Sequence, residues 1–120
     1  MSYRSFEELD VWKRGCSVCV QVYEVLKDCR DFSLKDQMTR SAVSIPSNIA
    51  QVPAMNSKKD FDRFLHIAKG SAAELRTQVN IACQIGMLKP KNSQELINEL
   101  KSISSILHGL IKTLKPKPSK

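Results

Sequence analysis

Hydrophobic residues recur at alternating steps of three and four along four segments of the chain. This spacing, close to 3.5 residues, is typical of helices that pack side by side. The four stripes are Leu9, Trp12, Cys16, Cys19, Tyr23 and Leu26; Met38, Ala42, Ile45, Ile49 and Val52; Phe61, Leu65, Ala68, Ala72, Leu75, Val79, Ala82 and Gly86; and Leu96, Leu100, Ile103, Leu107, Leu110 and Leu114. The pattern predicts four amphipathic helices that share one core.

Each stripe is preceded or opened by a helix-capping arrangement. A Ser or Asn oxygen there accepts a hydrogen bond from a free backbone N–H, and an acidic residue three positions later reaches back. The four arrangements are Ser5…Glu8, Ser33…Asp36, Ser57…Asp60 and Asn92…Glu95. They predict four helix starts.

The connections near residues 28–33, 53–57 and 86–92 are short, so consecutive helices should be antiparallel neighbours. Gly86 suits a C-terminal cap, Pro90 should stop any continuation, and Pro46 should kink the second helix. We therefore predict an all-α fold, an antiparallel up-down-up-down four-helix bundle over residues 1–115, followed by a basic C-terminal tail at 116–120. No internal repeat or second domain is indicated.

A second apolar stripe lies beside the first one on the N-terminal helix, formed by Val11, Val18, Val22 and Val25. Further apolar residues widen the stripes of the third and fourth helices. A small bundle does not need apolar positions so far round its helices. The surplus either widens the core or, as we expect, is partly buried between subunits of a homo-oligomer.

Positive charge is concentrated in the second half of the chain. Of the 120 residues, 19 are Lys or Arg and 12 are Asp or Glu, a net charge of +7. Four lysines near the C-terminus have no acidic neighbour: Lys112, Lys115, Lys117 and Lys120. Together with the weaker candidates Lys89 and Lys91 at the turn before the last helix, they favour contact with RNA or DNA phosphates. The alternative is a solvated end that keeps the protein soluble.

Composition narrows the class of protein. An apolar fraction of 42% is too high for a disordered chain. No apolar run is long enough to span a membrane, and the first residues lack the apolar region of a signal peptide. The expectation is a cytoplasmic protein without a membrane partner.

The sequence offers little catalytic chemistry. Cys16 and Cys19 form one C-x-x-C pair, but both lie on the predicted core stripe and no second pair exists. We expect reduced, buried thiols. His66 and His108 have no partner at catalytic spacing, and no glycine-rich phosphate loop is present. We therefore expect no enzymatic activity, no cofactor and no metal.

A polar constellation is predicted between the second and third helices. In an antiparallel hairpin with its turn near residues 54–57, Arg40 falls opposite Ser71 and Glu74. Asn48 continues the polar side of the second helix. An Arg40–Glu74 pair would set the register of the two helices. The alternative is a solvated face of scattered polar residues.

Three runs of residues resemble a known family. They are Phe6-Glu7-Glu8-Leu9-x-Val11-Trp12, Leu34-x-x-Gln37-x-x-Arg40-x-Ala42-x-Ser44-Ile45-Pro46-Ser47-Asn48-Ile49-Ala50 and Phe64-Leu65-x-Ile67-Ala68-x-Gly70-Ser71-x-x-Glu74-Leu75-x-Thr77-Gln78. Over roughly residues 5–115 the chain is similar to the four-helix-bundle proteins encoded in intervening sequences of bacterial large-subunit ribosomal RNA genes. The resemblance implies a ring-shaped homopentamer without enzymatic activity. A distantly similar bundle is the accessory protein of diversity-generating retroelements, which implies as the alternative function an adaptor for a reverse-transcriptase-like partner.

The chain departs from the family pattern at three places. Gln51 begins a Gln-Val-Pro run where Glu-Gly is usual, and Asp62 and Asn80 replace residues that are commonly apolar or aromatic. Asp62 and Asn80 are 18 residues apart, five helical turns, so they share one face of their helix. Together with Val18, Val22 and Val25 they are the predicted oligomer-interface residues. The two polar side chains would oppose association if they lie in the contact.

Overall fold

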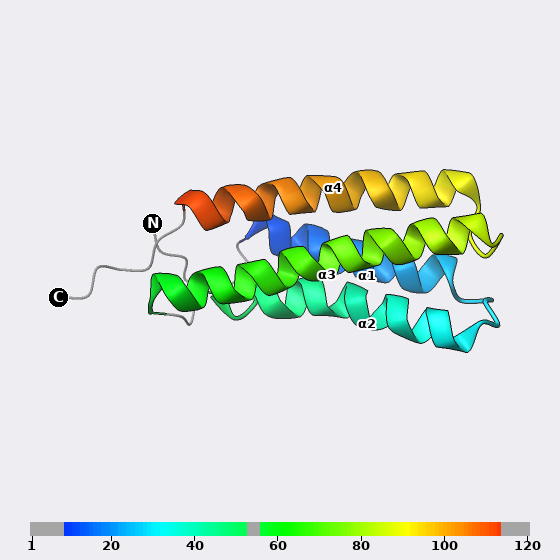
Figure 1. Cartoon of the computed structure of the whole chain (residues 1–120), viewed down its shortest axis with the longest axis horizontal. Coiled ribbons are helices and arrows are strands. Elements are labelled where there is room, and N and C mark those ends of the chain that lie inside the picture. The colour runs from blue at the N-terminus through cyan, green and yellow to red at the C-terminus, as the bar shows by residue number, and fades with distance from the viewer. Residues whose placement is uncertain (1–8, 53–55, 114–120) are drawn as a thin grey trace.

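Four helices form the part of the protein that the structure describes. The computed structural model describes residues 9–52 and 56–113. Its elements are α1 (Asp10–Val25), α2 (Phe32–Ile49), α3 (Lys58–Gln84) and α4 (Pro90–Thr113) (Figure 1). Consecutive helices run in opposite directions, and the packed pairs are α1–α2, α2–α3, α3–α4 and α1–α4. The predicted all-α antiparallel bundle is confirmed. The boundary between bundle and tail expected near residue 115 lies outside the described residues.

The helix starts agree with the predicted caps only in part. At α3, Ser57 Oγ accepts from the Asp60 amide at 3.2 Å, as predicted. The Asp60 carboxylate reaches back to the Ser57 side chain, whose hydroxyl donates to Oδ2 at 3.0 Å. At α2 the cap is Asp31, whose Oδ1 accepts from the Leu34 amide at 3.0 Å. Ser33 lies inside the helix, so its predicted capping role is wrong. An aspartate two residues earlier already supplies the acceptor.

The other two helices begin without the predicted caps. Pro90 is the first residue of α4, a position that suits proline because the first helical N–H has no intrahelical partner. Asn92 is therefore inside the first turn. The helix α1 begins after Leu9 with no side-chain cap, and the predicted cap Ser5 lies outside the described residues.

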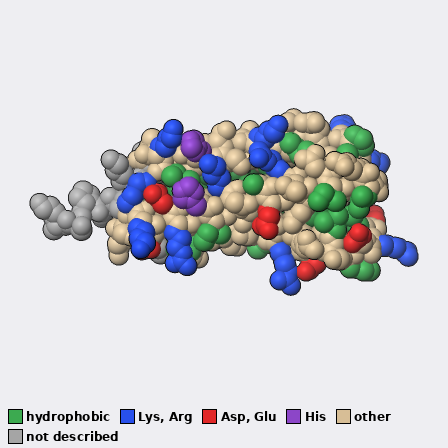
Figure 2. Space-filling model, viewed as in Figure 1, with side chains coloured by type: hydrophobic (Ala, Val, Ile, Leu, Met, Phe, Trp, Pro, Cys, Tyr) green, Lys and Arg blue, Asp and Glu red, His purple; other side chains and the backbone are tan. Residues whose placement is uncertain are grey.

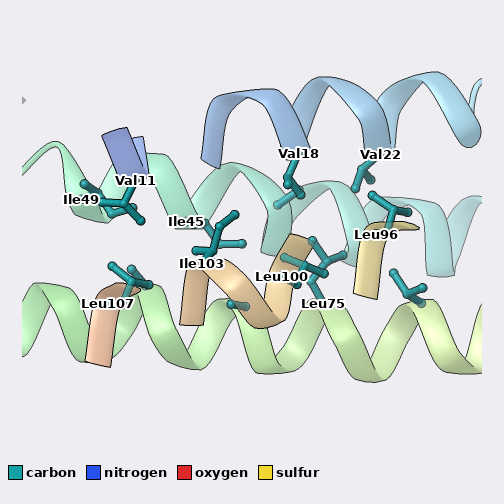
Figure 3. Packing of buried hydrophobic residues seen from close by; sticks show 14 of the residues in the cluster. Val11, Val18, Val22, Ile45, Ile49, Leu75, Leu96, Leu100, Ile103 and Leu107 are labelled. Atoms are coloured by element: carbon teal, nitrogen blue, oxygen red, sulfur yellow. The ribbon is translucent and has the colours of Figure 1, made fainter. Parts of the chain in front are cut away.

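The apolar stripes of α2, α3 and α4 meet in the bundle core, as Figure 3 shows for labelled residues that include Ile45 of α2, Leu75 of α3 and Ile103 of α4. Nearly every predicted stripe residue of these helices within the described ranges is buried. They are Met38, Ala42, Ile45, Ile49, Val52, Phe61, Leu65, Ala68, Ala72, Leu75, Val79, Ala82, Leu96, Leu100, Ile103 and Leu107. Leu110 is half-buried against them, and Gly86 is an exposed terminator with φ of 81°. Pro46 lies within α2, which continues to Ile49.

The core face of α1 differs from the prediction. Leu9 and Leu26 of the predicted stripe are buried, as predicted. Between them Val11, Val18 and Val22 point into the core, whereas Tyr23 of the predicted stripe is exposed. Trp12, Cys16 and Cys19 are half-buried. Both stripes have helical spacing, so spacing alone does not choose between them.

Gly15 decides which face of α1 is buried. A Cβ atom at Gly15 would lie 3.3 Å from Ile45 Cγ2 and 3.5 Å from Pro46 Cβ, so the glycine allows α2 to approach α1 closely. Val11, Val18 and Val22 lie on the same face of the helix as Gly15. The predicted interface role of Val18 and Val22 is therefore wrong, because both side chains are buried in the core of a single chain. Val25 is half-buried and packs against that core.

Among the helices of the described residues, none has both the length and the apolarity needed to cross a membrane.

Candidate nucleic-acid interface

Basic side chains from α3 and α4 meet along the flank that the two helices share. Lys69 and Arg76 are seven residues apart on α3, and Lys101 and His108 are seven apart on α4. A seven-residue step is two helical turns, so each pair lies on one face of its helix. Antiparallel packing brings Lys69 Nζ to 3.2 Å from His108 Nδ1. It also places Arg76 and Lys101 at the same two hollows.

These two adjoining hollows form what we call the α3–α4 groove. One, of about 440 Å³, is lined by Lys69, Arg76, Lys101, Ser104, Ser105 and His108. The other, of about 460 Å³, is lined by Ala73, Arg76, Thr77, Asn80, Gln94, Ile97 and Lys101. No carboxylate is among these lining residues. Figure 2 shows the histidines, of which His108 lines the groove, near Lys and Arg side chains and with acidic side chains close by.

The groove has the chemistry of an anion site. Guanidinium and ammonium groups supply charged hydrogen-bond donors, and Ser and Thr hydroxyls add neutral ones. Lys69 and Arg76 on α3 and Lys101 on α4 spread their positive charges along the furrow over about two helical turns, which favours an extended anion over a single ion. A polynucleotide backbone has that charge pattern.

The structure does not bring together in one site the predicted lysines that it describes, Lys89, Lys91 and Lys112. Lys89 and Lys91 lie at the α3–α4 turn, whereas Lys112 lies in the last turn of α4. The 21 residues from Lys91 to Lys112 correspond to about 32 Å of helix. Lys112 follows His108 by one turn and so continues the line of the groove. Lys115, Lys117 and Lys120 lie outside the described residues.

The groove cations themselves were not predicted from the sequence. A signal was available in the paired seven-residue spacings, Lys69 with Arg76 and Lys101 with His108. Its meaning depends on the register between α3 and α4, which a count of charges along the chain does not provide.

Asp62 and Asn80 share one face of α3, as their spacing predicted, and this face lies on the α4 side. Asn80 lines the groove, and its Nδ2 donates to the Arg76 carbonyl at 3.2 Å. Asp62 Oδ1 accepts from Lys58 Nζ at 2.6 Å, and the same ammonium donates to the Ile111 carbonyl of α4. The Asp62 carboxylate is therefore paired within the chain. Gln51 is exposed just after α2.

The polar constellation between α2 and α3 forms around serines, without the predicted ion pair. The Ser44 and Ser71 hydroxyls are 2.7 Å apart, and Asn48 Nδ2 donates to Ser44 Oγ at 3.0 Å and to the Ser44 carbonyl at 2.8 Å. Arg40 pairs instead with Asp36, one turn away on its own helix, at 2.9 Å. The predicted Arg40–Glu74 pair is wrong, because the Asp36 carboxylate lies one turn away on the same face of α2 and binds the Arg40 guanidinium instead.

The cysteines lie at the edge of the core. All four are free and half-buried, so the predicted full burial of Cys16 and Cys19 is wrong. Burial raises the pKa of both thiols, and for Cys19 the neighbouring Cys16 adds to the shift. Protonated thiols are poor nucleophiles and metal ligands. No three His, Cys, Asp or Glu side chains within residues 9–52 and 56–113 are grouped to hold a metal ion.

An apolar surface runs along α1 and α2, on the opposite side of the bundle from the groove. Val20 is 61% exposed, Tyr23 52%, Phe32 71% and Val43 42%. Val43 lies three residues before Pro46, which contacts α1, and so lies on the flank of α2 that faces α1. Val20 and Tyr23 also line a hollow of about 420 Å³ on α1. We call these four residues the α1–α2 apolar strip.

Comparison with known proteins places this bundle in a family. A crystal structure described as a protein with unknown function from the S23 ribosomal protein family of Bacteroides thetaiotaomicron has a similar fold, with a TM-score of 0.81. The sequences are 24% identical, and the match covers 86% of this chain and 99% of the other. No curated protein matches the chain. A family model described as 23S rRNA-intervening sequence protein matches residues 7–109. The chain belongs to the 23S rRNA-intervening sequence protein family.

Proposed function

We propose that this protein is a non-enzymatic nucleic-acid-binding protein and that it holds the phosphate backbone in the α3–α4 groove. The observation that carries the proposal is the set of lining residues: Lys69, Arg76, Lys101 and His108 with no carboxylate among them. Solubility alone does not require three cations to share one furrow that no carboxylate lines.

The proposal is tested by the salt dependence of RNA binding. Titration of a fluorescein-labelled single-stranded RNA, followed by anisotropy at several salt concentrations, gives the slope of log affinity against log salt. Each phosphate neutralised on a single strand contributes about 0.7 to that slope. Replacing Arg76 and Lys101 together by Gln should weaken binding and reduce the slope by about 1.4.

A matched control separates the groove from net charge. Arg30→Gln with Lys13→Gln removes the same two charges from exposed positions elsewhere on the bundle. This control should lose much less affinity than the groove variant. Equal losses in the two variants, or no binding of the wild type at low salt, would overturn the proposal.

We also propose that the protein forms a homo-oligomer, with a pentamer as the expected state, through the α1–α2 apolar strip. A soluble monomer seldom exposes several large apolar side chains side by side. Full burial of one such side chain contributes about 1.5–3 kcal/mol, so a few per subunit suffice for association. Val18 and Val22, which the sequence predicted as interface residues, are buried in the core of each chain. The α1–α2 apolar strip is therefore the interface that we propose in their place.

Light scattering at micromolar concentration tests the assembly. The wild type should have a mass of several chains, and Val20→Glu with Val43→Glu should reduce it to one. Ile67→Glu, at an exposed site on α3, is the control and should leave the mass unchanged. A wild-type mass of one chain would contradict self-association and favour the alternative, an adaptor whose strip contacts a reverse-transcriptase-like partner.

A further inference from the structure

A second polar hollow lies on the other flank of α3, against α2. This α2–α3 cleft, of about 240 Å³, is lined by Gln37, Arg40, Ser41, Ser44, Ser71, Glu74 and Gln78. At about 30 Å³ per water molecule it has room for a planar ring system rather than for an ion alone.

The cleft contains an unused hydrogen-bonding group. Gln78 Oε1 is buried, and it has no hydrogen-bond partner among the described residues. Leaving a buried acceptor unpaired is costly, and most such groups are satisfied by protein, water or a ligand. A donor from a bound molecule would satisfy this one.

The cleft offers acceptors and donors together. Glu74 is exposed and forms no ion pair within residues 9–52 and 56–113, so its carboxylate is available as an acceptor. Arg40 and Gln37 supply donors, and the hydrogen-bonded hydroxyls of Ser44 and Ser71 lie between α2 and α3. Asp36 pairs with Arg40 through Nε, which leaves the outer nitrogens of the guanidinium for another partner.

The presence of both hydrogen-bond donors and acceptors in the cleft favours a ligand that carries both kinds of group. A phosphate presents acceptors only, and Glu74 would repel it. An arginine or lysine side chain presents donors only, and Arg40 would repel it. A nucleobase edge carries both, and unpaired RNA bases are commonly read by polar side chains on that edge and by stacking on Arg.

We propose that the α2–α3 cleft binds an unpaired guanine base of the RNA held in the α3–α4 groove, an inference that rests on the proposed function. Guanine places two adjacent donors, N1–H and the N2 amino group, where a carboxylate such as Glu74 can accept both. Its O6 accepts from Arg40 or Gln37. The second hydrogen of the N2 amino group can donate to Gln78 Oε1.

The positions of the two sites along α3 fit one bound strand. Residues 69–80 supply the groove on one flank and residues 71–78 supply the cleft on the other. Gly70 and Thr77 lie on the outer ridge between them, and a Cβ at Gly70 would meet open space. Because this ridge is low, an RNA strand whose backbone lies in the α3–α4 groove can place one base across α3 into the α2–α3 cleft.

Discrimination between single bases tests the cleft. The probes are uridine decamers with one central guanosine, inosine, adenosine or cytidine, read by fluorescence anisotropy at fixed salt. The guanosine probe should bind roughly five- to tenfold more tightly than the inosine probe, which lacks only the N2 amino group. Glu74→Gln should remove this preference.

The controls separate the cleft from the groove. Glu95→Gln makes the same charge change on the exposed surface of α4 and should keep the preference for guanosine. Arg76→Gln with Lys101→Gln should weaken all four probes by the same factor. Salt-dependent binding of all four probes with equal affinity would overturn the guanine site while leaving the groove standing. If no probe binds at low salt, both proposals fail.

Discussion

Arg14 of α1 and Glu99 of α4 form a bidentate ion pair between these two neighbouring helices. Arg14 Nε donates to Glu99 Oε2 at 2.7 Å, and Nη2 donates to Oε1 at 2.8 Å. The hydrogen bonds from Arg14 hold the pKa of Glu99 below the ordinary value of 4.5. A carboxyl group whose pKa is lowered by folding stabilises the protein only where it is ionised. Its contribution is therefore present above about pH 4.5 and is lost as the pH falls through the lower folded value.

We predict that Glu99→Gln lowers the free energy of unfolding by about 1 kcal/mol at neutral pH, a modest figure because both side chains are about one-third exposed. The difference should shrink as the pH falls below 4.5 and Glu99 becomes protonated in the folded protein. Urea unfolding followed by circular dichroism measures both values. Glu95→Gln, one turn earlier and exposed, is the control and should change neither. A difference that persists in acid would contradict the role assigned to the charged pair.

At the scale of the helix, two glycines have opposite surroundings. Gly15 of α1 is packed against Ile45 and Pro46, whereas Gly70 of α3 has open space where a side chain would be. Gly70→Ala should therefore raise the free energy of unfolding by about 1 kcal/mol, through helix propensity alone. Gly15→Leu should lower it by about 1–3 kcal/mol by forcing α1 away from α2. Thermal unfolding of the two variants checks this contrast, and a stabilised Gly15→Leu would contradict the packing of α1.

The same contrast shows what the sequence could predict. The predicted stripes of α2, α3 and α4 identified the core, although α3 and α4 carry further apolar residues beside them. On α1 the two neighbouring stripes were both suitable, and the tight contact at Gly15 that chooses between them involves residues 30 positions away. The α3–α4 groove escaped prediction for a related reason. Lys69 and His108 become neighbours only through the register of two helices.

At the scale of the whole molecule, the helix order places the α1–α2 apolar strip and the α3–α4 groove on opposite sides of the bundle (Figure 1). Subunits joined through the strip would each keep a groove free. Several grooves on one particle raise the affinity for an RNA long enough to reach more than one of them.

We therefore predict that Val20→Glu with Val43→Glu weakens binding of a long single-stranded RNA by at least tenfold. Binding of a decamer should stay unchanged, because a decamer occupies one groove. Anisotropy with labelled RNAs of the two lengths makes the comparison. Equal losses for both lengths would mean that the strip itself contacts RNA.

The α1–α4 contact, the last of the four packed pairs, joins the first helix of the chain to the last one. With an even number of antiparallel helices, the start of α1 and the end of α4 point toward the same end of the bundle (Figure 1). The helices thus form a closed ring in space although they form an open line in sequence. A circularly permuted gene, with a linker joining α4 to α1 and new termini at the turn beside Gly86, would retain all four packing interfaces. Such a permutant should fold to the same bundle and would carry its chain ends at the opposite pole.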